Sequence, residues 1–140
     1  TEKLRSIEDK NTRRNYMASH FAYCTFSGVF SEQANDKLVE HSRYLCLDFD
    51  HVQDLEALKR TLLDDPYFET ELMFRSPSDD GLKWIVKINT ALMPHSEYFR
   101  SVSNYQVKTY GIEPDKSGKD VSRACFLPFE PEAYLNPEIR

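Results

Sequence analysis

The chain has 140 residues, the usual size of one domain. Its 18 lysine and arginine residues against 23 aspartate and glutamate residues give a formal net charge of −5. Because binding to a nucleic-acid backbone depends on cationic contacts, this charge argues against a protein that holds nucleic acid mainly by bulk charge. No apolar run approaches the ~20 residues of a membrane span, so we expect a cytoplasmic protein with no membrane contact.

The cysteine content argues against a metal knuckle. The three cysteines, Cys24, Cys46 and Cys125, are far apart in the sequence and form no CxxC pair. Zinc knuckles and structural disulfides of small domains need closer or paired spacing. We therefore expect buried free thiols, as in a reducing compartment.

The first 43 residues predict a helix and a strand. Ser6 to Asp9 matches a capping box, which predicts a charged helix from there to about Ser19. Residues 21–26 are β-type and are followed by the turn residues Ser27 and Gly28. Residues 33–40 are weakly helical.

From Tyr44 onward the apolar spacing predicts strand, helix, strand, strand, helix and strand, at residues 44–50, 52–63, 71–75, 82–89, 96–110 and 124–129. This order is that of the ferredoxin-like or RRM-like split βαβ palm, βαββαβ, an α+β fold with an antiparallel sheet and helices on one face. We expect one domain, with residues 1–43 as an N-terminal helix-strand extension, 44–130 as the palm-like core and 131–140 as a tail. The chain is also expected to be a piece of a larger replication protein.

The split βαβ topology predicts where polar residues meet. The first and third strands are central, and the first runs antiparallel to the third and the last. The C-terminal end of the first strand carries Asp48 and Asp50, so it should lie beside residues 76–83 and 120–123. The apolar side chains that alternate with these aspartates face the helices, and both carboxylates therefore project from the open face.

Three carboxylates form the predicted metal site. Asp48 and Asp50 repel each other unless a cation lies between them, and Asp120 can supply a third oxygen ligand. Mg²⁺ or Mn²⁺ suits such an oxygen-only site, and substrate phosphates would complete its ligand shell. The alternative is that Asp48 and Asp50 only end the strand and cap the following helix.

The turn after the second strand predicts nucleotide contacts. Ser76 and Ser78 offer hydroxyl groups, Gly81 permits close backbone approach, and Lys83 points to the open face. Hydroxyl groups, backbone N–H groups and a cation near a metal ion suit a triphosphate. Arg123 either clamps a phosphate or pairs with a neighbouring acid. The alternative for the turn is an ordinary hairpin connection.

These motifs resemble a known family. The segments LCLDFD (45–50), RSPSDDGLK (75–83) and SGKDVSRACF (117–126) resemble the N-terminal domain of virulence-associated E (VirE-like) proteins, in the archaeo-eukaryotic primase superfamily of primase-polymerases. The resemblance runs from the first helix to Pro137.

The resemblance implies roles for the same residues. Asp48 and Asp50 match the metal-binding hDhD motif, Asp120 matches the third acidic residue, and Lys83 stands where the family's nucleotide-contacting motif has histidine. It also implies an enzyme that acts on NTP or dNTP and DNA in a mobile element or phage-like module. A helicase-type ATPase domain would follow in the same polypeptide.

Three hypotheses result. The first is a primase-polymerase domain that adds nucleotides with two Mg²⁺ or Mn²⁺ ions, as a catalytic site of Asp48, Asp50 and Asp120. The second is a non-catalytic nucleotide- or nucleic-acid-binding module, and the third is a cyclase-like palm. The first requires that Asp120 meets Asp48 and Asp50 in space.

Overall fold

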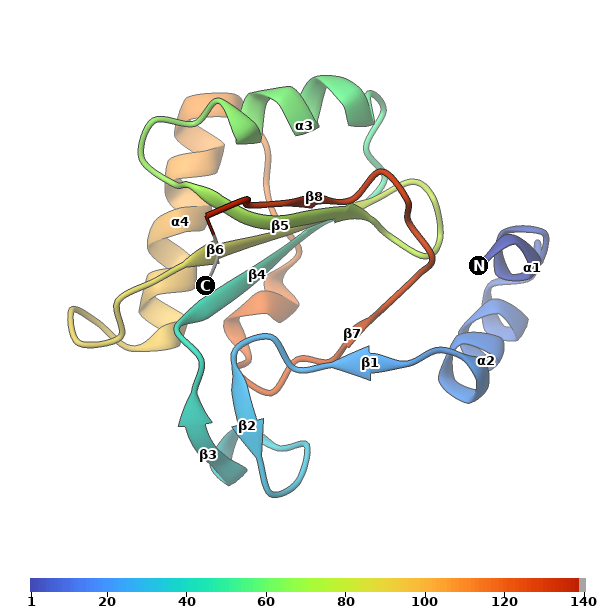
Figure 1. Ribbon diagram of the computed structural model, residues 1–140, viewed down its shortest axis with the longest axis horizontal. Helices are drawn as coiled ribbons and strands as arrows, with labels where there is room; N and C mark the ends of the chain where they lie inside the picture. The colour runs from blue at the N-terminus through green and yellow to red at the C-terminus, as the bar shows by residue number, and fades with distance from the viewer. Residues whose placement is uncertain (139–140) are drawn as a thin grey trace.

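The computed structural model describes residues 1–138 and has an α+β architecture, as predicted (Figure 1). Its helices are α1 (Glu2–Arg5), α2 (Lys10–His20), α3 (Leu55–Leu63) and α4 (His95–Tyr110), with short 3-10 helices η1 (Asn35–Lys37) and η2 (Lys116–Lys119). Its strands are β1 (Tyr23–Cys24), β2 (Gly28–Phe30), β3 (Leu38–His41), β4 (Tyr44–Phe49), β5 (Thr70–Arg75), β6 (Leu82–Lys87), β7 (Cys125–Phe126) and β8 (Tyr134–Leu135).

The main sheet has the order β4-β6-β5-β8, and all its pairings are antiparallel. The order β4-β6-β5 matches the neighbours expected for the first, third and second strands, but β4 is an edge strand and not a central one, so the ferredoxin-like palm is not confirmed. The last predicted strand differs, because residues 124–129 do not join this sheet. Instead β7 pairs with β1 in a separate two-stranded ribbon. The edge of β5 is extended by β8, which lies in the predicted tail.

A loop, and not β7, lies along the outer edge of β4. The Asp115 N–H donates a hydrogen bond to the Asp48 carbonyl oxygen at 2.7 Å. A Cβ on Gly118 would lie 3.0 Å from the Cys46 carbonyl oxygen, so η2 passes very close to β4 at a point where only glycine fits. The loop before β7 therefore covers the edge of β4 where the last strand was expected.

The N-terminal segment differs from its prediction in detail. The cap of α2 is Asp9, whose carboxylate accepts a hydrogen bond from the Thr12 N–H at 2.8 Å. Ser6 instead bonds back to the Lys3 carbonyl oxygen at the end of α1, so the predicted capping box is wrong. The expected helix at 33–40 is wrong beyond the single turn η1, because β3 follows and pairs with β2.

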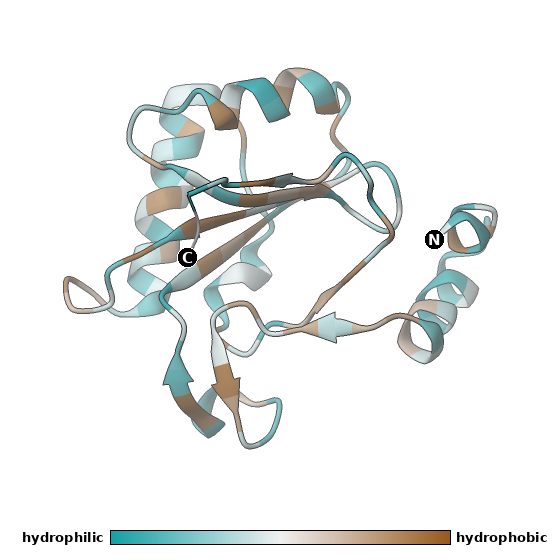
Figure 2. Ribbon diagram, in the orientation of Figure 1, coloured by the Kyte–Doolittle hydropathy of each residue, from teal (hydrophilic) through white to brown (hydrophobic). Residues whose placement is uncertain are grey.

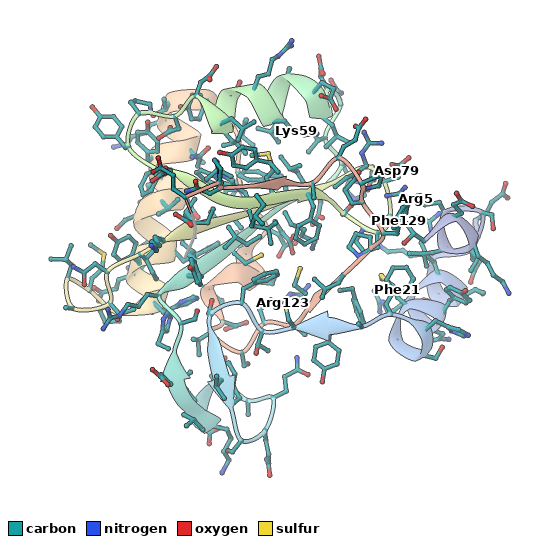
Figure 3. The ribbon with its side chains drawn as sticks, viewed as in Figure 1. Arg5, Phe21, Lys59, Asp79, Arg123 and Phe129 are labelled. Carbon is teal, nitrogen blue, oxygen red and sulfur yellow. The ribbon has the colours of Figure 1, made fainter. Side chains whose placement is uncertain are left out.

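The N-terminal segment is attached to the core at the 76–81 turn. The Arg5 guanidinium donates to the Pro77 carbonyl oxygen at 3.2 Å and pairs with Asp79 at 3.7 Å. Figures 2 and 3 show α1 and α2 at one end of the molecule, with teal polar positions on α2 and with Arg5 and Asp79 side by side. Through this contact and the β1–β7 pairing, the predicted extension forms part of the same packed body.

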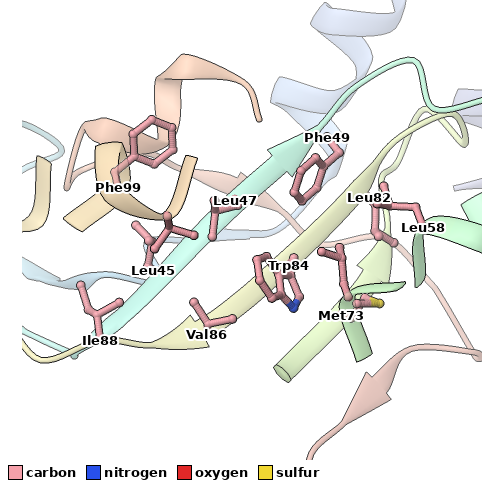
Figure 4. Close-up of a cluster of buried hydrophobic side chains, with 12 residues drawn as sticks. Leu45, Leu47, Phe49, Leu58, Met73, Leu82, Trp84, Val86, Ile88 and Phe99 are labelled. Carbon is pink, nitrogen blue, oxygen red and sulfur yellow. The ribbon is translucent and has the colours of Figure 1, made fainter. Parts of the chain in front are cut away.

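The core lies between the main sheet and helices α3 and α4. Alternate residues of β4 and β6 face these helices, and Trp84 is fully buried there with its indole N–H donating to the Thr70 hydroxyl at 2.8 Å. The cluster consists of Leu45, Leu47, Phe49, Leu58, Leu62, Met73, Leu82, Trp84, Val86, Ile88, Phe99 and Val102 (Figure 4). The residues between them, including Cys46, Asp48 and Lys83, therefore point to the opposite face, as predicted.

The opposite face carries a smaller apolar cluster. Phe74, Ile85 and Cys125 form its buried part, and Phe26 and Cys46 pack against them. Cys125 belongs to β7, so the β1–β7 ribbon lies over this face of the sheet. None of the helices within residues 1–138 is both long and apolar enough to cross a membrane.

Candidate functional site

A cavity of about 660 Å³ lies beside the β1–β7 ribbon, and residues from α2, β1, the 76–81 turn, β6 and β7 line it. Its size is within the range of small-molecule sites. Five of the predicted site residues line it: Asp50, Ser76, Ser78, Lys83 and Arg123. Segments remote in the sequence therefore converge here, although the last strand is not where the prediction had it.

Asp48 and Lys83 form a buried ion pair at this cavity. They are directly opposite each other in the β4–β6 register, and the Lys83 ammonium contacts the Asp48 carboxylate. Their side chains are only 12% and 13% exposed, respectively. Burial is the largest single effect and lowers the pKa of Lys83, but the Asp48 carboxylate, together with Cys125 and Cys46, outweighs it, so the net shift in the pKa of Lys83 is upward. The lysine ammonium thus supplies the positive charge that the sequence analysis assigned to a metal ion.

Asp50 and Asp115 form a second pair of groups, and both are carboxyls. Burial, then the Asp48 charge, then contact with Asp115 raise the pKa of Asp50. The pKa of Asp115 is lowered chiefly by Ser117, whose backbone N–H donates a hydrogen bond to the Asp115 carboxylate at 2.8 Å. One proton shared at this contact would relieve the repulsion, and a cation would do the same.

Asp120 lies in a different environment. Its carboxylate accepts a hydrogen bond from the Asn35 side chain at 3.4 Å, and its charge acts on His95. The acid beside Asp50 is Asp115, which the sequence analysis did not consider. Within residues 1–138, no group of three or more histidine, cysteine or acidic side chains is placed to hold a metal ion. The convergence of Asp48, Asp50 and Asp120 around bound metal ions remains a prediction that these contacts do not support.

The 76–81 turn is held together by its own hydroxyl groups. The Ser76 hydroxyl accepts a hydrogen bond from the Gly81 N–H at 3.1 Å and lies 3.2 Å from the Ser78 hydroxyl. A Cβ on Gly81 would lie 2.8 Å from the Phe49 carbonyl oxygen, so glycine permits the turn to pack on the end of β4. Ser76 and Gly81 thus fix the shape of the turn, and both Ser76 and the more exposed Ser78 line the cavity.

Two arginines from different segments line the same cavity. Arg14 comes from α2, and Arg123, labelled in Figure 3, comes from the turn before β7. Both are exposed, and neither has an ion-pair partner within the part of the chain that the structure describes. Because Asp48 already compensates Lys83, these two arginines are the cations of the lining without a counter-charge among the described residues, and Asp50 is the acid beside them.

An aromatic pair completes the lining. Tyr23 and Phe126 are opposite each other in the β1–β7 ribbon, with ring centroids 6.2 Å apart and planes at 73°. The cavity is also lined by Arg14, Tyr23, Gln33 and Phe126, none of which was a predicted site residue. The β-type run at 21–26 indicated a strand that carries Tyr23, but its partner strand, which carries Phe126, could not be identified from the sequence.

Comparisons with known proteins identify one family. The model of the BT4734-like, N-terminal domain family matches residues 16–135. No curated protein and no solved structure matches the sequence. The resemblance to VirE-like domains is wrong, because the matching family is a different one and nothing in these comparisons indicates the primase superfamily. The match spans most of the chain, which therefore belongs to the BT4734-like N-terminal domain family.

Proposed function

We propose that the cavity beside the β1–β7 ribbon binds a nucleotide. The observation that carries this proposal is the set of cations in the lining. Arg14 and Arg123 face the cavity without an ion-pair partner in the described part of the chain, beside Lys83, which is paired with Asp48, and one acid, Asp50. They do so in a chain whose net charge is −5. Cationic side chains drawn from three separate segments favour an anionic ligand. Guanidinium groups bind phosphate through two parallel hydrogen bonds, which suits a phosphate chain.

The aromatic pair supports a nucleotide over inorganic phosphate. The ring of Tyr23 is exposed at the same cavity, and its residue is 55% exposed. Stacking of a base on an aromatic ring contributes about 1–3 kcal/mol. A ligand with phosphates at one end and a planar base at the other matches both groups of side chains, and NTP and dNTP have this form.

A second candidate function is metal-dependent nucleotidyl transfer. It is favoured by the contact between the Asp50 and Asp115 carboxyls, because Mg²⁺ or Mn²⁺ bound to nucleotide phosphates would relieve their repulsion. Asp50 lines the cavity, so such an ion would lie next to the phosphates. A DNA template and a helicase-type ATPase domain were implied by the VirE-like resemblance and lose that support with it.

Titration of the protein with ATP by calorimetry tests the proposal. We expect saturable binding by the parent, and we expect Arg14→Gln and Arg123→Gln each to weaken it about tenfold, since a hydrogen bond to a charged group contributes roughly 1.5 kcal/mol or more. Tyr23→Ala should weaken ATP binding but leave tripolyphosphate binding unchanged.

The matched control is Arg60→Gln, which removes an exposed arginine on α3 away from the cavity. Equal loss of affinity in Arg60→Gln, or no saturable ATP binding by the parent, would overturn the assignment. Repeating the titration in Mn²⁺ and in EDTA, and assaying pyrophosphate release, tests the second candidate. Pyrophosphate release that depends on Mn²⁺ and is abolished by Asp50→Asn would support nucleotidyl transfer. Absence of pyrophosphate release would reject nucleotidyl transfer.

A further inference from the structure

All three cysteines of the chain converge at one place in the fold. Cys24 is directly opposite Cys125 in the β1–β7 ribbon, and Cys125 is packed in the apolar cluster to which Cys46 of β4 also contributes. All three thiols are free. The meeting point is where the ribbon lies over the open face of the main sheet.

Cys46 packs against the buried cluster that contains Cys125, on the open face of the sheet. Cys125 is 4% exposed, whereas Cys46 is partly buried. The neighbouring Cys46 thiol, and then the nearby Lys83 ammonium, lower the pKa of the Cys125 thiol against the opposing effect of burial. A lowered pKa increases the fraction of Cys125 present as thiolate, the form that reacts.

We propose that Cys46 and Cys125 are a redox-responsive pair that closes to a disulfide and ties β7 to β4. With hydrogen peroxide as oxidant, the Cys125 thiolate attacks one peroxide oxygen and the O–O bond breaks, which gives a sulfenic acid and, after protonation, water. The Cys46 thiol then attacks the sulfenic sulfur, the S–O bond breaks, and the hydroxyl leaves with a proton as a second water. The two thiols lose two electrons in total, and the peroxide gains them.

Strand geometry favours Cys46 over Cys24 as the partner of Cys125. Cβ atoms directly opposite each other in an antiparallel pair are about 4.5–5.5 Å apart. A disulfide needs a Cβ separation of about 3.8 Å, so a Cys24–Cys125 bond would pull the two strands together. A link between Cys46 and Cys125 joins two layers that already pack together in one apolar cluster.

The link would restrain one wall of the candidate nucleotide cavity. Arg123, Ala124 and Phe126 flank Cys125 in the chain and line that cavity. Lys83, on β6 next to β4, also lines this cavity. This consequence for binding rests on the proposed function, whereas the formation of the disulfide does not.

Peptide mapping by mass spectrometry after mild peroxide treatment of the whole chain tests the proposal. We expect one cross-linked peptide pair containing Cys46 and Cys125, reversible by dithiothreitol, and an upward shift of the melting temperature on oxidation. Cys24→Ser should form the same link. Cys46→Ser and Cys125→Ser should form none, and neither should show the shift.

A Cys24–Cys125 link, or three thiols that all remain reduced or overoxidise without pairing, would overturn the inference. The ATP titration is then repeated with the oxidised protein, where we expect a several-fold change in affinity that dithiothreitol reverses. If the reduced protein does not bind ATP, the proposed function fails, while the peptide map still decides whether the disulfide forms.

Discussion

Lys83 gives the open face of the sheet its charge balance. Asp48 would be a buried carboxylate without a counter-charge if the side chain opposite it on β6 were neutral. Such a charge is costly in a poorly solvated position. The strand register places an ammonium there, so the aspartate is compensated without a metal ion, and Lys83 reaches the cavity lining at the same time.

Replacing Lys83 by methionine tests this balance. Lys83→Met leaves Asp48 buried and unpaired, and we expect a loss of about 3–5 kcal/mol in the free energy of unfolding, measured by urea denaturation. The double variant Asp48→Leu/Lys83→Met should regain most of that loss, because neither charge remains. Lys87→Met, on the same face of β6 but exposed, is the control and should change stability little. A double variant as unstable as Lys83→Met would contradict the ion-pair explanation.

At the scale of elements, Asp65 connects the end of α3 to α4. Its carboxylate accepts hydrogen bonds from the Tyr67 and Phe68 N–H groups at 2.8 Å each, and from the hydroxyls of Tyr105 and Tyr110 on α4. Burial raises the pKa of Asp65, but these hydrogen bonds outweigh it and the net pKa is lowered. The ionised carboxylate therefore holds the two helices together.

The lowered pKa of Asp65 predicts a pH-dependent contribution to stability. A carboxyl with a lowered folded-state pKa stabilises the protein above its unfolded-state pKa, and this stability is lost as the pH falls through the folded-state pKa. Asp65→Asn should cost about 1–3 kcal/mol near neutral pH, and its difference from the parent should shrink as the pH approaches about 2. Denaturant titrations at several pH values measure this, with the exposed neighbour Asp64→Asn as control. A difference that does not change with pH would exclude this role.

At the scale of the whole molecule, two histidines join three segments. The His41 ring, on β3, lies 3.1 Å from the His95 ring at the start of α4, and His95 contacts the Gly118 carbonyl oxygen at 3.0 Å. Burial is the main cause that lowers the pKa of each ring; for His41 the neighbouring His95 adds to it, whereas for His95 the Gly118 carbonyl and Asp120 oppose it. The β2–β3 hairpin, α4 and η2 thus meet at a pair of neutral imidazoles.

This junction predicts that the protein loses stability in mildly acidic solution. Below the ordinary histidine pKa, His41 and His95 are protonated in the unfolded chain but stay neutral in the folded protein, because their folded-state pKa values are lowered. The free energy of unfolding therefore decreases as the pH falls, until the pH reaches those lowered pKa values. The melting temperature should therefore fall between about pH 7 and about pH 5, and His41→Gln should reduce that slope. His20→Gln, an exposed histidine on α2, should leave the slope unchanged. An equal slope in His41→Gln and the parent would contradict the prediction.

The sequence by itself determined most of the local structure of the core. Alternation in residues 44–50 and 82–89 predicted β4 and β6 and the faces that they present, because the strand period is fixed by backbone geometry. The spacing of Leu55, Leu58 and Leu62 predicted α3, and Gly111 ends α4 in the left-handed conformation, as predicted. The same alternation, with the turn that joins β5 to β6, predicted Asp50, Ser78 and Lys83 on a common side.

Only the tertiary structure decided what lies beside the free edge of β4. That edge can accept a strand or a loop with similar backbone hydrogen bonds. Gly118 lets the loop lie close against it, so Asp115 rather than Asp120 meets Asp50. The pairing of β1 with β7, which brings Tyr23 and the three cysteines together, has no local signal because its two strands are two residues long and about 100 residues apart. Contacts of this kind depend on the balance of packing across the whole molecule, and no local pattern encodes that balance.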